Sequence, residues 1–210
     1  MDMTVWLTFV AASVALLMIP GPTILLVMSY ALSQGRRVAV ASAGGVALGD
    51  AVAMGASLAG LGALVLASAT LFTVLKWIGA AYLVWMGWKL WRSAGAMTLG
   101  EVATEGEVTP RAVFGHAAVV TALNPKSIVF FIAFVPQFID PNAALGPQFA
   151  ILIATFVGLA TLNALAYALL AARLRDGLRR PSVLRAMGRL GGAALMAMGA
   201  ATALTRRTTA

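Results

Sequence analysis

The chain has 210 residues, of which 61% are hydrophobic and only 10% are charged. A soluble domain is nearer half apolar and a quarter charged, so this composition excludes an ordinary water-soluble fold. The net charge of +8 does not indicate nucleic-acid binding, because the basic residues flank apolar runs, as in membrane proteins. The absence of cysteine excludes disulfides and thiolate metal sites, and with a single histidine we expect no metal centre and no cofactor.

The apolar runs predict an all-α integral membrane protein whose single transmembrane domain covers residues 1–210. A spanning helix needs about 20 mostly apolar residues, which leaves room for roughly six helices. The predicted helices cover about 5–32, 38–64, 69–91, 112–138, 145–172 and 190–205. The last could begin as early as Ser182 if Arg185 and Arg189 extend to the interface. No cleavable signal peptide is expected, because Asp2 stands where a basic segment should be.

Lysine and arginine are distributed unequally between the two sets of predicted loops. Eleven lie in or beside the loops after the first, third and fifth helices, and three lie on the opposite side. The positive-inside rule places the first set in the cytoplasm, which puts both termini outside.

Two predicted helices contain a proline-centred interruption, Pro20-Gly21-Pro22 in the first and Asn124-Pro125-Lys126 in the fourth. Proline lacks an N–H group, and the carbonyls it frees need partners that lipid cannot supply. Paired interruptions at corresponding positions predict two inverted three-helix repeats, about 1–92 and 111–210, joined by a polar loop over 93–110. The alternative for each break is a kink that only shapes helix packing.

Asp50 and Lys126 are ionisable residues placed well inside predicted helices. A centred carboxylate costs about 2.5–3.5 kcal/mol on insertion scales, so Asp50 is expected to carry a proton or hold a substrate ammonium group. The alternative is a structural partner for a lysine or a backbone break. Lys126 could pair with Asp50, bind a substrate carboxylate, or snorkel to the interface. Asn124 could satisfy freed carbonyls, and Gln137 and Asn163 could line a cavity.

Small and aromatic residues favour structural roles. Gly45 and Gly49 have the spacing that allows two helices to approach closely, and Gly188 and Gly192 repeat it. The second pair fits packing within the bundle or between the subunits of a homodimer. The tryptophans of the third predicted helix are typical of packing or an interfacial belt. His116 is expected to be structural, with a proton relay as the alternative.

The order and spacing of these motifs resemble the LysE/RhtB family of amino-acid exporters. The residues that carry the resemblance are Pro20-Gly21-Pro22, Ser33-Gln34-Gly35-Arg36-Arg37, Gly44-Gly45, Gly49-Asp50, Gly79-Ala80-Ala81-Tyr82-Leu83, Gly87-Trp88, Asn124-Pro125-Lys126 and Pro136-Gln137-Phe138.

The resemblance implies secondary export of amino acids or their derivatives, coupled to the proton-motive force, in a bacterial inner membrane. The implied substrates include basic amino acids, threonine, homoserine, its lactone and branched-chain types. Among these we favour neutral substrates of the homoserine, threonine or lactone type slightly over basic ones, because Asp50 alone is little support for binding a basic side chain. The implied partners are the substrate, protons and the lipid bilayer. The implied pathway residues are Pro20, Gly21, Pro22, Asp50, Asn124, Pro125 and Lys126.

Three other functions are compatible with a membrane protein of this size. A scaffold or accessory subunit would tolerate neutral replacement of Asp50 and Lys126 together, and a passive channel would conduct without a proton gradient. An intramembrane enzyme is disfavoured, because the chain offers no cysteine and His116 has no obvious catalytic partner.

Overall fold

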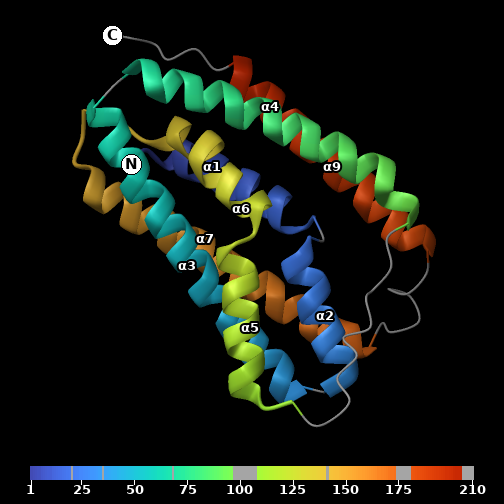
Figure 1. Cartoon of the computed structure of the whole chain (residues 1–210). Coiled ribbons are helices and arrows are strands. Elements are labelled where there is room, and N and C mark those ends of the chain that lie inside the picture. The colour runs from blue at the N-terminus through green and yellow to red at the C-terminus, as the bar shows by residue number, and fades with distance from the viewer. Residues whose placement is uncertain are drawn as a thin grey trace.

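The parts of the chain that the computed structural model describes are residues 1–19, 21–34, 36–67, 69–96, 108–140, 142–173 and 181–204. Every regular element in these ranges is a helix, as predicted (Figure 1). Two helices, α3 (Arg36–Ala67) and α7 (Leu145–Arg173), contain stretches long and apolar enough to cross a membrane. Two bent helix pairs raise the number of candidate spans to four if each pair is one span.

The first predicted helix is two helices, α1 (Met3–Leu17) and α2 (Pro22–Gln34), bent by more than 40°. Asp2 caps α1, because its carboxylate accepts a hydrogen bond from the backbone N–H of Thr4 at 2.7 Å. Pro22 begins α2, where a missing N–H costs nothing. The predicted break is confirmed, although Pro20 lies outside the described residues.

The fourth predicted helix is also interrupted, and it continues in an irregular form. α5 (Pro110–Ala122) is followed by α6 (Pro125–Val129), and the segment Pro125–Phe138 that begins with α6 is bent by 41° from α5. A π-helical turn, η2 (Phe130–Phe134), and a 3-10 turn, η3 (Val135–Phe138), complete the segment. Pro136 has no N–H to donate to the carbonyl four residues earlier, so the regular α-helical pattern cannot continue there.

α4 (Ala69–Ser93) runs antiparallel to α9 (Pro181–Leu204), and η1 (Ala94–Ala96) follows α4 (Figure 1). A Cβ atom at Gly87 would lie 2.6 Å from the carbonyl oxygen of Gly192, so these helices meet backbone to backbone. This contact places Gly192 inside the bundle rather than between subunits.

The predicted start of the last helix at residue 190 is wrong, because α9 begins at Pro181, one residue before the alternative start. Arg185 and Arg189 are exposed on this helix, so their charges do not end it.

α3 and α5 run parallel to each other in close contact. A Cβ atom at Gly45 would collide with the carbonyl oxygen of Phe114, and one at Gly49 would lie 2.5 Å from that of Ala118. The prediction that these two glycines allow close helix approach is confirmed. The contact fixes the segment just before Asp50 against α5.

α1 and α7 form a second parallel pair. The indole N–H of Trp6 donates to the hydroxyl of Thr155 at 3.0 Å, and further along both helices Asn163 donates to Leu17. A core of buried aromatic rings lies beside this pair, where Phe131 meets Phe156 edge to face at 4.8 Å. These contacts hold the end of α1 against the middle of α7.

Candidate functional site

The two helix breaks meet through one side chain. Lys126, in the first turn of α6, donates from its ammonium group to the carbonyl oxygens of Ile19 at 2.9 Å and Leu16 at 3.2 Å. Its side chain is only 8% exposed, so it is turned into the bundle rather than snorkelling outwards. Gly21 makes room for it, because a Cβ atom there would lie 3.3 Å from Nζ of Lys126. The cation of the second break therefore caps the end of α1.

α7 supplies the remaining donors to the end of α1. The amide of Asn163 donates to the carbonyl oxygen of Leu17 at 3.0 Å. The hydroxyl of Tyr167 donates to the carbonyl oxygen of Met18 at 3.2 Å. A helix ends with four carbonyls that lack intrahelical partners. The consecutive carbonyls of residues 16–19 all receive side-chain donors from α6 or α7.

Asn124 links the second break to the first. Its side-chain oxygen accepts from the backbone N–H of Lys126 at 3.1 Å and caps α6, while its amide donates to the hydroxyl of Thr23 at 3.1 Å. Thr121 donates to the same hydroxyl at 3.4 Å. Asn124 therefore joins α6 to α2 and does not satisfy carbonyls freed by Pro125.

Asp50 lies on α3 and is 3% exposed. Gly49, the residue before Asp50, packs against Thr121, whose hydroxyl bonds to that of Thr23, so Asp50 belongs to the part of α3 that borders the two breaks. Among the described residues, its carboxylate forms no direct ion pair. Asp50 and Lys126 are thus two buried charged residues of opposite sign, and a carboxylate without an ion pair can accept a proton or a cationic group.

The structure brings five predicted site residues to this region, which we call the break junction. They are Gly21, Asp50, Asn124, Lys126 and Asn163.

Pro22 and Pro125 begin α2 and α6 beside the junction residues, but their own side chains are exposed. Pro20 lies outside the described residues. Gln137 is also exposed, and it lines a separate cavity of about 590 Å³ together with Asp2 and Asp140.

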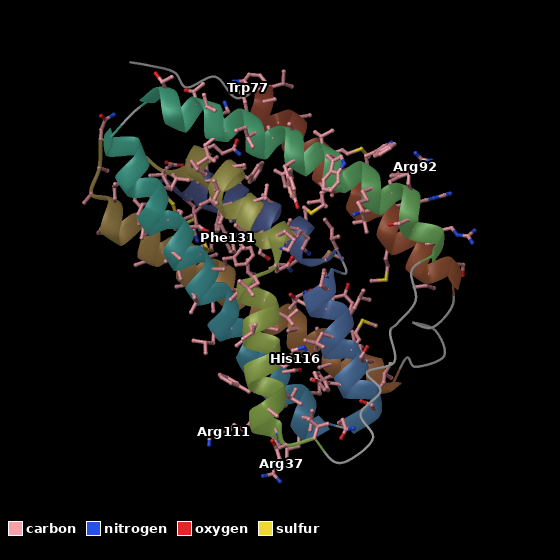
Figure 2. All side chains as sticks on the ribbon, viewed as in Figure 1. Arg37, Trp77, Arg92, Arg111, His116 and Phe131 are labelled. Carbon is pink, nitrogen blue, oxygen red and sulfur yellow. The ribbon has the colours of Figure 1, made fainter. Side chains whose placement is uncertain are left out.

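Sequence reasoning missed three residues of the junction, namely Thr23, Thr121 and Tyr167. Hydroxyl groups are common in membrane helices, so no local signal distinguishes them. His116, also seen in Figure 2, bonds instead to the hydroxyl of Tyr30 between α5 and α2, at 2.8 Å. Within the described residues, no group of three or more acidic residues and histidines is arranged to hold a metal ion.

Comparison with known proteins gives a consistent picture. Residues 14–206 match the family of LysE type translocators. A homoserine/homoserine lactone efflux protein of Salmonella typhimurium is 35% identical over 204 residues, covering 96% of this chain and 97% of that protein. A leucine efflux protein of Salmonella choleraesuis is 34% identical over 149 residues, or 70% of each chain. An uncharacterized membrane protein of Vibrio cholerae is 38% identical over 199 residues, 95% of this chain and 96% of its own length. No solved structure matches the sequence.

Proposed function

Because the chain belongs to the family of LysE type translocators, we propose that it exports a neutral amino acid or an amino-acid derivative from a bacterial cell. The relative named as a homoserine/homoserine lactone efflux protein aligns over almost the whole chain, which supports small polar substrates of that type. The relative named as a leucine efflux protein supports a neutral substrate in general.

The observation that carries this proposal is the break junction, where Lys126 holds the freed carbonyls of α1. An ammonium group has three donors, and the carbonyls of Leu16 and Ile19 take two of them. The third can bind the carboxylate or carbonyl of a substrate. The substrate ammonium group would be held by Asp50, the buried carboxylate of α3. A zwitterion would thus lie between two opposite charges.

Asp50 is the residue we assign to proton coupling. A carboxylate enclosed in a protein core is costly in its charged form unless it is paired. Protonation from outside would neutralise it and release the substrate ammonium group. Loss of the proton to the cytoplasm would restore the anion for the next cycle. Export would therefore draw on the proton-motive force.

We propose six spans in two inverted repeats, in which α4 and α9 join the four candidate spans. In such an arrangement, the first span of each half runs parallel to the second span of the other half. α1 runs parallel to α7 and α3 runs parallel to α5, while α4 and α9 are antiparallel.

The third helix of each half also touches the broken span of the other half. Gly79 of α4 meets Ala133 of η2, and Gly191 of α9 would place a Cβ atom 2.6 Å from the side chain of Ile19. Both termini would then lie outside the inner membrane, as the positive-inside rule requires.

Alternating access would act through the break junction. The hydrogen bonds of Lys126 and Asn124 join the two breaks, so they tie the two halves together at one point. A substrate held by the third N–H of Lys126 would lie at this point, so its binding and release would favour different arrangements of the two halves.

Efflux from intact cells tests the proposed function. Cells expressing the chain are loaded with a panel of labelled neutral and basic amino acids and homoserine lactone, and efflux is measured with and without a protonophore. We expect faster efflux of a neutral class that stops when the protonophore is added. Efflux that persists with the protonophore would indicate a passive channel, and no enhanced efflux of any member would contradict amino-acid export.

A further inference from the structure

The outer face formed by α4 and α9 contains an apolar groove of about 510 Å³. Its lining is aromatic, small or aliphatic and includes Trp77, Trp85, Trp88, Met196, Gly199 and Ala203. The three tryptophans are about half exposed, at 48–54%. The small residues of α9 form the floor of the groove. A Cβ atom added at Gly199 would lie only 2.7 Å from the carbonyl oxygen of Ala80, so α9 packs closely against α4 there. This groove lies away from the break junction and has no role in the proposed transport.

Four basic residues lie at one end of this face. Lys89 and Arg92 belong to the last turns of α4, and Arg185 and Arg189 belong to the first turns of α9. The helices are antiparallel, so these ends meet, and Arg185 reaches within 3.8 Å of a Cβ atom built at Gly95. All four side chains are exposed, and α4, η1 and α9 contain no acidic residue. We call these residues the basic cluster.

Two tryptophans connect the basic cluster to the groove. Nζ of Lys89 lies 5.2 Å from the ring centroid of Trp85, and Cζ of Arg92 lies 4.9 Å from that of Trp88. Cations at this distance from an aromatic face are attracted by the ring. The same rings line the groove, so the positive charge is held at its mouth.

We propose that this face binds one anionic phospholipid, with an acyl chain in the groove and the phosphate at the basic cluster. Basic pockets between helices on the cytoplasmic side of a membrane recognise anionic headgroups. A zwitterionic lipid would bring an ammonium group to the same four cations, so it would bind less well. Figure 2 shows Arg92 toward one end of α4 and Trp77 toward the other, whereas Arg37 and Arg111 lie on a separate part of the molecule.

Tryptophan quenching by brominated lipids tests this proposal, because four of the five tryptophans lie on α4. The protein is reconstituted in vesicles of phosphatidylcholine, and brominated phosphatidylglycerol is titrated against brominated phosphatidylcholine. We expect phosphatidylglycerol to quench at a much lower mole fraction. The double variant Arg185→Gln/Arg189→Gln removes the attraction of two positive charges for the phosphate. Its preference for phosphatidylglycerol over phosphatidylcholine should therefore be roughly 30-fold weaker.

The matched control is Arg37→Gln/Arg111→Gln, which removes the same charge elsewhere and should keep the preference. Lys89→Gln/Arg92→Gln removes the other half of the basic cluster and should repeat the loss, even if the α9 variant fails to fold. Equal quenching by both lipids in the unmodified protein would overturn the proposal. An equal loss of the phosphatidylglycerol preference in the basic-cluster variants and in the control variant would also overturn the proposal. Quenching by neither lipid would show that a second protein chain covers the groove.

Discussion

Lys126 shows how a membrane protein can tolerate an interrupted helix. The carbonyls that a proline break frees cannot bond to lipid, and each unsatisfied group costs several kcal/mol in hydrocarbon. Here one ammonium group serves Leu16 and Ile19, and Asn163 and Tyr167 serve the carbonyls between them. The same residue is thus both a structural cap and a candidate ligand for the substrate. This double role predicts that its replacement affects stability and transport together.

We expect Lys126→Gln to lower the free energy of unfolding by about 1–3 kcal/mol, because it removes the ammonium donor from two buried carbonyls. Export should be lost as well. Thermal unfolding in detergent and cell efflux measure the two effects. Arg111→Gln, which removes an exposed charge, is the control and should change neither. A Lys126→Gln protein with unaltered stability and export would contradict both roles.

At the scale of elements, close backbone contact between α3 and α5 fixes Asp50 in place. Gly49 precedes Asp50 and faces Ala118 and Thr121, whereas Gly55, on the same helix, has no atom within 4 Å of an added Cβ atom. The helix therefore provides two glycines with opposite surroundings, and the same substitution can be compared at both.

Gly49→Ala is expected to destabilise the protein by about 1–3 kcal/mol, because the methyl group collides with backbone atoms that cannot move aside. Gly55→Ala should be neutral or stabilising by up to about 1 kcal/mol, since alanine favours a helix. Thermal unfolding compares the two variants. Equal stabilities would show that α3 and α5 are not in backbone contact.

The sequence predicted the helices and their breaks well, because apolar run length and proline position act locally. The breaks near Pro22 and Pro125 both lie where expected. The π-helical turn was not predicted, since apolar run length does not mark irregular turns. The start of α9 at Pro181 agrees within one residue with the alternative start at Ser182, whereas apolar run length alone placed it at residue 190.

The site was predicted in part. Asp50, Asn124 and Lys126 are distinctive as polar residues within apolar runs. Tyr167 reaches a carbonyl that lies 149 positions away in the chain, which only the fold reveals.

For the whole molecule, the paired parallel and antiparallel helices argue for two halves of opposite orientation. The absence of cysteine makes this orientation directly testable with single introduced thiols. Arg111 lies in the first turn of α5, at the end expected in the cytoplasm, and Ala144 precedes α7 at the end expected outside; both are exposed.

An impermeant thiol reagent applied to intact cells, once the outer membrane has been made permeable, should label Ala144→Cys and leave Arg111→Cys unlabelled. Inverted vesicles should give the reverse pattern, because the positive-inside rule places Arg111 in the cytoplasm. Labelling of both positions from the same side would show that both lie on one side of the membrane. The segment from α5 to η3 would then not cross the membrane once, which would contradict the proposed topology.

The central claim is that Asp50 couples proton movement to substrate movement at the break junction. The most direct test is transport of the substrate found by cell efflux into proteoliposomes, with and without an imposed pH gradient. Unmodified protein should accumulate the substrate against its gradient. Asp50→Asn should still insert but should fail to accumulate the substrate when the pH gradient is applied, because the neutral amide carries no proton and no longer holds the substrate ammonium group. Uphill transport by Asp50→Asn at the unmodified rate would contradict the account.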